Sequence, residues 1–515
     1  MGQMIVTGRC RLRDAVLIVL AASILLSPAA AASEESVRRP RFFVPDFSPG
    51  DGKDESSWVA LAVSEGLRAR LRRSGVTEAV SGTRTAGVLQ RMVGNGTPNP
   101  EQIVRTARLL GADWTVMGVA SVTDEGEFAL KVRARHVKQP ERDRTGSVQA
   151  SSLRALLENT TNAALELTGI ELNEAQQKRI SATPEGSDTA LEYYAKAVRA
   201  VRASKPNDAL FYVAQSRRHE AGFRPTLRLL GQINVAAGNQ REVLLVFESL
   251  LRRAKLADDP VDVIFALTQI AIAHQRLGRA DIAEEYYRAA QKEARRIGLR
   301  DYQAVLFGAI ATLRVDQRKS DEAVSLLQER LKLLEQLGDR LALGPACMTL
   351  GLVYAAKKDT RQAVAYLSRS VKHAEEVDIP ADKASALFQI GELHKEAGEL
   401  DEALKAYQAS IVSSKESEAG SAYRQMAEVY DRQGDLAKAL EMLRKAESIL
   451  SGRRAYAQQA DCLARIARIH AKRNDHAEAV DIMAEAVEIL SDLGHPELDA
   501  YKKELAEMQA KHRPK

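Results

Sequence analysis

Small residues recur along this chain at an interval of 34 to 40 positions. In order they are Ala209, Val243, Ala283, Ala323, Ala363, Ala403, Ala439 and Ala479. An interval of this length, together with helical spacing of apolar residues, is typical of helix pairs stacked in a linear array. Each pair buries its apolar surface only against its neighbours, so the pattern predicts an all-α solenoid of about eight helix pairs. This favours recognition over catalysis as the function.

Three more positions recur in step with the small residue. If Ala384 is position 1 of one copy, Gly391, Gly398, Ala403 and Tyr407 stand at positions 8, 15, 20 and 24. Small residues are expected at positions 8 and 20, because helices approach and cross there. Position 15 is Gly or Asn in most copies, which predicts a left-handed cap that ends the first helix of each pair. Position 24 is a bulky apolar residue, expected to fill the space between copies.

With these positions the chain resembles the tetratricopeptide repeat (TPR) family between Asp188 and Glu507. The 40-residue steps exceed the family's usual interval of about 34 and predict longer second helices or longer turns. Position 15 is Arg318 in one copy, and the degenerate first copy around Ser204 and Ala209 is expected to act as a cap. We expect repeats over residues 188–491 and a capping helix with a tail over residues 492–515.

Residues 1–32 are predicted to be an export signal. Arg9, Arg11 and Arg13 precede the apolar run Ala15–Leu26, and Ala29–Ala32 offers an A-x-A cleavage site. The run is too short to span a bilayer, although an uncleaved anchor and a cytoplasmic apolar segment are alternatives. The signal predicts a periplasmic location for the mature protein.

A separate small α/β domain is predicted over residues 40–180, so the whole chain is expected to be of the α+β class. The expected elements are a strand in Arg41–Phe47, helices at Trp58–Arg73 and Glu101–Leu110, strands at Trp114–Ala120 and Phe128–Val137, and a helix at Leu153–Leu167. Glu141–Arg144 is expected to be a polar loop.

The strand Phe43–Phe47, which contains a proline, and the segment Leu110–Trp114 make this domain similar to the N-terminal domain of TolB-like periplasmic proteins. That resemblance implies a domain that contacts other proteins and catalyses no reaction. It agrees with an exported protein of modest net charge, +5, which lacks the basic stripe that nucleic acid requires.

No catalytic, cofactor or metal site is predicted. His274, His394 and His470 all stand at position 11, where other copies have tyrosine, so a structural role is expected instead of metal ligation. Cys347 and Cys462 lie three copies apart, too far for a disulfide, and are expected to be buried thiols. The run Arg68, Arg70, Arg72 and Arg73 is expected to be a solvated face, with contact to an anionic surface as the alternative.

The best candidate site is a stripe on the first helices at positions 2, 5, 9 and 12, which in TPR proteins lines a groove. Its residues are Arg228, Gln232, Thr268, Gln275, Met348, Leu352, Glu392, Lys395, Arg424, Glu428, Asp431 and Arg468. An apolar centre with charged flanks would suit an amphipathic helix or an extended segment of a protein partner, unless these residues are simply solvated. The sequence therefore predicts an exported, non-enzymatic scaffold for protein partners. The alternative is a sensory or regulatory subunit whose repeats bind a small ligand or a cell-wall fragment.

Overall fold

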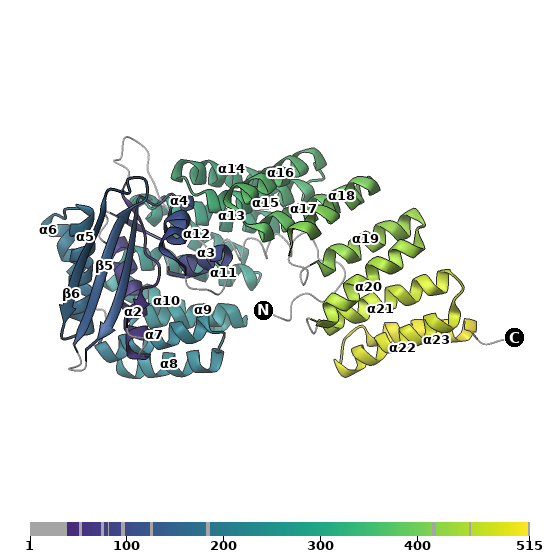
Figure 1. Ribbon diagram of the computed structural model, residues 1–515, viewed down its shortest axis with the longest axis horizontal. Coiled ribbons are helices and arrows are strands. Elements are labelled where there is room, and N and C mark those ends of the chain that lie inside the picture. Colours follow the sequence, from purple (N-terminus) through teal and green to yellow (C-terminus); the bar gives the residue numbers. More distant parts are fainter. Residues whose placement is uncertain are drawn as a thin grey trace. The chain divides into compact units, whose positions relative to one another are not determined.

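The computed structural model describes residues 39–50, 54–73, 77–80, 82–93, 98–123, 127–181, 186–414, 419–452 and 455–512. The expected fold class is confirmed, because a small strand-containing domain precedes a long run of helices that forms a repeat solenoid (Figure 1). The predicted signal at residues 1–32 lies outside the described ranges. Contacts divide the chain into two units, Val16–Ala346 and one that contains Cys347–Lys515.

The N-terminal domain is built on a six-stranded sheet, in which five strands have the order β3-β1-β4-β5-β6 and β2 pairs in parallel with β4. Its strands are β1 (Arg41–Phe43), β2 (Ser48–Pro49), β3 (Glu78–Ala79), β4 (Trp114–Val122), β5 (Phe128–His136) and β6 (Asp143–Ala150). β1 pairs in parallel with β3 and β4, whereas β4, β5 and β6 are antiparallel. The helices are α2 (Asp54–Arg73), α3 (Gly82–Val93), α4 (Pro100–Leu109), α5 (Leu153–Thr168) and α6 (Glu174–Ser181).

The core of this domain lies between the sheet and helices α2 and α5. Alternate residues of the long strands, such as Val116, Leu130 and Val132, pack with Val63 of α2 and Leu157 of α5. The strand periodicity of two therefore selects one buried face, as the sequence pattern predicts.

The sequence did not predict β6, nor the elements β2, α3 and α6. Asp143 and Arg144, expected in a loop, instead begin β6, while Glu141 and Arg142 lie in the turn before it. β6 could not be predicted from apolar alternation, because Val148 is its only buried residue. It is held by its backbone ladder to β5 and by Asp143, which accepts bonds of 2.8 and 2.5 Å from Arg133.

The helices of the array alternate regularly between first and second members of a pair. In the unit that ends at Ala346 they are α7 (Asp188–Arg202), α8 (Pro206–His219), α9 (Arg224–Ala237), α10 (Gln240–Leu256), α11 (Pro260–Arg276), α12 (Ala280–Arg296), α13 (Arg300–Asp316) and α14 (Ser320–Leu337). α15 (Arg340–Ala356) crosses the boundary. The other unit holds α16 (Thr360–Val377), α17 (Pro380–Glu396), α18 (Leu400–Ser413), α19 (Gly420–Gln433), α20 (Leu436–Gly452), α21 (Tyr456–Lys472), α22 (His476–Asp492) and α23 (Leu498–His512).

The longer interval comes from longer helices in both members of a pair. Where the step is 40 residues most helices have 17 or 18 residues, as α11 and α12 do. Where the step falls to 34 or 36, the helices α8, α9, α18 and α19 have 14. The difference is about one turn per helix.

Both small positions of the repeat are confirmed as close contacts. Every recurring small residue from Ala209 to Ala479 lies in a second helix with at most 1% of its surface exposed. Position 8, however, is small chiefly to admit the position 24 side chain of its own pair. A Cβ at Gly391 would lie 2.6 Å from the Tyr407 ring, and one at Gly231 would lie 2.3 Å from the Phe247 ring.

The left-handed cap at position 15 is confirmed in each copy. The φ angles there are 56° at Ser204, 77° at Gly238, 75° at Gly278, 61° at Arg318, 62° at Lys358, 79° at Gly398, 80° at Gly434 and 64° at Asn474. Four copies therefore adopt this conformation without glycine, although it is strained for an L-residue. The position in the repeat decides the backbone conformation even where the residue type opposes it.

Candidate interaction surfaces

The N-terminal domain and the first repeats share one hydrophobic core. Leu61 of α2 packs with Ala197 of α7 and Leu229 of α9. The core of the domain in turn includes Ala190 and Leu191 of α7. The domain is therefore packed against the first helices of the array and is not a separate module on a linker.

The same domain also contacts the turn between α14 and α15. Arg41 of β1 lies 3.3 Å from Asp339, and their side chains are only 3% and 0% exposed. Beside this pair, Gly111 has a φ of +68°, and a Cβ there would lie 2.4 Å from the carbonyl oxygen of Leu337. Only glycine fits this approach, because it lacks the Cβ and tolerates positive φ.

The arginine run on α2 is not a solvated face, which corrects the expectation from the sequence. Arg68 and Arg70 are each only 1% exposed. Arg68 donates to the carbonyl of Val44 at 2.6 Å and pairs with Asp46 at 2.9 Å. Burial alone would raise the pKa of Asp46, but the charges of Arg68 and of Arg202 on α7 outweigh it and hold that pKa below its usual value. Arg72 is half-buried, and the Arg73 side chain lies outside the described residues.

Arg228, the first candidate of the predicted stripe, lies at this contact. Its guanidinium stands 3.7 Å from the centre of the Phe265 ring and 3.0 Å from Asp262. Burial alone would lower the pKa of Arg228, but the neighbouring Tyr302 and Asp262 outweigh it and raise that pKa. Burial lowers the pKa of Arg72 of α2, and the neighbouring charge of Arg228 lowers it further. Arg228 therefore faces the chain's own N-terminal domain.

Other candidates in this unit also bond within the chain. Thr268 is 2% exposed and donates to the carbonyl of Ile264 on its own helix. Gln275 donates to Asp316 at 2.8 Å and accepts from Tyr287 at 3.0 Å. Gln232 is half-buried.

The apolar centre predicted for the stripe offers little surface. Met348 is 8% exposed and Leu352 is 1% exposed. Both side chains serve the packing of the helices, and neither presents an apolar patch to a partner.

The remaining six candidates do come together, on the first helices of the C-terminal repeats. We call them the C-terminal polar row: Glu392, Lys395, Arg424, Glu428, Asp431 and Arg468. They form ion pairs between successive first helices: Lys395–Glu428 at 3.6 Å, Arg424–Asp461 at 2.5 Å, Asp431–Lys472 at 2.6 Å and Arg468–Glu504 at 2.7 Å. Glu392 lies 3.2 Å from Lys395 and accepts a hydrogen bond from Tyr407.

The partners Lys472 and Glu504 were not predicted. Lys472 stands at position 13, one residue beyond the stripe, and Glu504 belongs to the capping helix. A search for opposite charges one repeat apart would have found Asp431–Lys472, because equivalent helices lie side by side in an array.

No metal site occurs in the ranges that the structure describes, where no three potential ligands converge. The position 11 histidines have local partners: His274 stacks on Tyr286 with ring centres 5.7 Å apart, and His394 lies 2.5 Å from Glu399. Cys347 and Cys462 are buried and not joined in a disulfide. Burial raises the pKa of the Cys462 thiol to about 12, so it is a poor nucleophile.

The helices within the described ranges do not combine the length and the apolar composition needed to cross a membrane.

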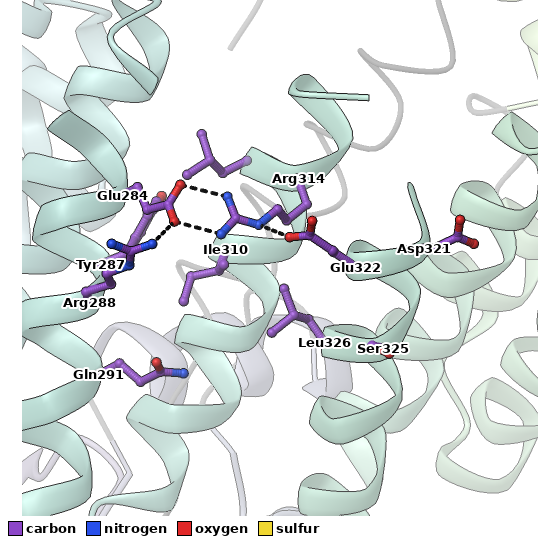
Figure 2. Close-up of a pocket in the computed structure, with 11 residues that line it drawn as sticks. Glu284, Tyr287, Arg288, Gln291, Ile310, Arg314, Asp321, Glu322, Ser325 and Leu326 are labelled. Atoms are coloured by element: carbon purple, nitrogen blue, oxygen red, sulfur yellow. Dashed lines mark hydrogen bonds and ion pairs between the residues drawn. The ribbon is translucent and has the colours of Figure 1, made fainter. Parts of the chain in front are cut away.

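A pocket of about 550 Å³ opens between α12, α13 and α14 (Figure 2). Its polar wall is an ion cluster in which Arg314 binds Glu284 through two bonds of 2.8 Å and Glu322 through one contact of 2.7 Å. Ile310 and Leu326 supply apolar wall. The ion cluster joins α12, α13 and α14, because Arg314 of α13 pairs with Glu284 of α12 and with Glu322 of α14.

The Glu284–Arg314 pair is expected to make stability depend on pH in the acid range. Its hydrogen bonds to Arg314 hold the pKa of Glu284 at about 2, against an ordinary value of 4.5. A lowered pKa stabilises the fold fully above pH 4.5, and this contribution is lost as the pH falls toward 2. Glu284→Gln should flatten that part of the urea midpoint's pH profile, whereas the exposed neighbour Glu285→Gln should not. Equal profiles for parent and Glu284→Gln would contradict the pairing.

Two segments, residues 345–411 and 418–492, match the model of the tetratricopeptide repeat family. The chain contains tetratricopeptide repeats. The resemblance to this family is thus confirmed. TPR arrays serve protein–protein interaction as a class. The resemblance of residues 40–180 to TolB-like domains stays a prediction. No curated protein sequence matches the chain.

Several solved structures resemble parts of the TPR protein. BtubC from P. vanneervenii has 17% identity and a TM-score of 0.37, over 42% of this chain and 92% of that one. A signal transduction ATPase (STAND) with a tetratricopeptide repeat sensor from Pyrococcus horikoshii has 15% identity and a TM-score of 0.45, over 69% and 56%. Aspartyl phosphate phosphatase F from Bacillus subtilis has 15% identity and a TM-score of 0.37, over 65% and 88%.

Proposed function

We propose that this TPR protein is a non-enzymatic scaffold of the bacterial cell envelope that binds a protein partner through its C-terminal polar row. The envelope location rests on the export signal expected at residues 1–32 and on the resemblance of residues 40–180 to TolB-like periplasmic domains. The absence of any recognisable nucleophile–base pair in the sequence supports a scaffold over an enzyme.

One contrast between the two units carries the choice of surface. In the first repeats the predicted stripe lies near the N-terminal domain, because the charge of Arg228 acts on Arg72 of α2. The apolar centre of the stripe, Met348 and Leu352, is buried. In the C-terminal polar row the side chains of Glu428 and Asp431 remain 30% and 32% exposed, and that of Arg468 is 39% exposed. These charges are ordered by their neighbours and still reach solvent, so a partner can bind them without first unfolding a contact.

The row favours a partner segment that carries both signs of charge. Arg424, Glu428 and Asp431 stand four and three residues apart, which places them on one side of α19. Lys395 of α17 lies beside Glu428, but its side chain is only 7% exposed. The positive charge that a partner can reach comes from Arg468, whose side chain is 39% exposed. A helix or strand with alternating acidic and basic side chains would therefore complement the row.

The test is loss of binding without loss of fold. The double variant Arg424→Ala, Glu428→Ala is expected to bind a partner isolated from the cell envelope about 30-fold more weakly or worse. This is the effect of losing an interface anchor worth about 2 kcal/mol. Its stability should change by about 1 kcal/mol or less, because these pairs are partly exposed. Isothermal titration and thermal unfolding measure the two effects.

A matched control removes an equal pair of charges from a second helix. Glu441 and Lys445 of α20 pair at 2.6 Å and are 56% and 47% exposed. Glu441→Ala, Lys445→Ala should leave binding unchanged. Unchanged binding in the Arg424, Glu428 variant would remove the polar row as the partner site, and cytoplasmic retention of a reporter fused after residue 40 would remove the envelope location.

A further inference from the structure

In the first two helix pairs, the second helices α8 and α10 differ from the second helices of all later pairs at one position that faces water. It is position 22, two residues after the recurring small residue. In later copies it holds Glu285, Ser325, Ala365, Lys405, Glu441 and Asp481. In the first two copies it holds Phe211 and Leu245, whose exposed fractions are 57% and 60%. The later copies thus show that small or charged residues are usual at this exposed position. Phe211 and Leu245 are large and apolar instead.

More large apolar side chains are exposed in the same two repeats. Leu210 is 44% exposed, Val201 is 40% exposed and Leu256 is 89% exposed. Leu256 follows Leu245 by eleven residues, three turns along the same side of α10. Exposed apolar side chains that gather on one surface mark a contact with a partner or a membrane.

A row of basic residues runs beside this patch. A basic residue stands nine positions after the small residue in five consecutive copies, at Arg218, Arg252, Lys292, Lys332 and Lys372, and all five side chains are exposed. Arg218 and Arg252 follow Phe211 and Leu245 by seven residues, which is two turns along the same side of each helix. The second helices α8 and α10 thus each present an apolar residue and a basic residue on one side.

We propose that this second-helix face, defined by Phe211, Leu245, Leu256, Arg218 and Arg252, docks the protein on an anionic lipid bilayer. Apolar side chains that enter the interface while arginine and lysine meet lipid phosphates are the two components of peripheral membrane binding. A nucleic acid would use the basic row but gives no role to an exposed Phe211.

The face lies on other helices than those that contact the N-terminal domain. α7 and α9, the first helices of these repeats, pack with Leu61 of the N-terminal domain. The exposed residues of α8 and α10 lie on the second helices, and the C-terminal polar row lies in other repeats. Membrane docking would therefore not require the domain to leave the array.

The test is co-sedimentation of the chain that follows residue 32 with vesicles. One set contains phosphatidylglycerol and phosphatidylcholine in equal amounts, and the other contains phosphatidylcholine alone. The parent should bind the anionic vesicles at least about tenfold more tightly, and added salt should weaken this binding. The variant Phe211→Glu, Leu245→Glu should lose at least about tenfold in binding.

Folding of that variant is expected to be intact, because glutamate occupies the same position at Glu285 and Glu441. A matched control is Lys405→Glu, which alters position 22 of a later copy and changes the net charge equally. It should bind like the parent, and thermal unfolding should confirm that both variants are folded. A parent without preference for anionic vesicles, or a Phe211, Leu245 variant that binds as well as the parent, would overturn the proposal. Tighter binding to duplex DNA that survives the variant would overturn it in favour of a nucleic-acid surface.

Discussion

Replacing Asp339 with alanine is expected to lower the free energy of unfolding by about 3–5 kcal/mol. Asp339 is fully buried, and Arg41 beside it is only 3% exposed. Removal of the carboxylate leaves the guanidinium in a site that water does not reach, and an uncompensated buried charge is costly. Asp339 also accepts a backbone bond from Ala342 at the start of α15. Urea unfolding followed by circular dichroism measures the loss.

A second variant distinguishes the cost of an unpaired buried charge from the cost of lost packing. Arg41→Met, Asp339→Leu replaces the pair with apolar side chains of similar size and should lose much less stability than Asp339→Ala, because the buried Arg41 guanidinium is removed together with the carboxylate. If Asp339→Ala unfolds at the same urea concentration as the parent, the N-terminal domain does not rest on the turn before α15.

Replacing Ala403 with tryptophan is expected to destabilise the C-terminal repeats by about 3 kcal/mol, the upper part of the range for overpacking. Ala403 has no exposed surface and packs in the cluster that contains Tyr407 and Met426. A large ring there forces α18 away from its neighbours. Since each repeat contacts only adjacent repeats, thermal unfolding should show a second, earlier step.

The control for this variant is Ala365→Trp, which alters a residue two positions after the buried Ala363. Ala365 of α16 is exposed, while Ala363 has no exposed surface. Ala365→Trp should change stability by about 0.5 kcal/mol or less. If Ala403→Trp unfolds like the parent and like Ala365→Trp, the register of the repeat is wrong.

The array was predictable because its determinants are local. Each helix pair has its own buried small residue and its own left-handed cap. The residues that determine the conformation of a copy therefore lie within that copy. Position 15 has positive φ even where the residue is Arg318 or Lys358, which disfavour that conformation. The surrounding helices set that backbone conformation, and the side chain only modulates its cost.

The candidate site was predictable in part for the same reason. Helical spacing alone places Arg424, Glu428 and Asp431 on one side of α19. Spacing could not show that Thr268 and Leu352 are buried, because their exposure depends on what packs over them.

The sequence by itself determined the repeats, their caps and the alternation of buried and exposed positions, all of which depend on residues within about 40 positions of one another. Only the tertiary structure decided that the basic run of α2 is buried and that the N-terminal domain rests on the first repeats. The pair that shows this, Arg41 and Asp339, is separated by 298 residues. No periodicity links two such positions, because their contact depends on the folding of all that lies between them. Local patterns therefore specify the helices, whereas the surfaces left free are a property of the assembled chain.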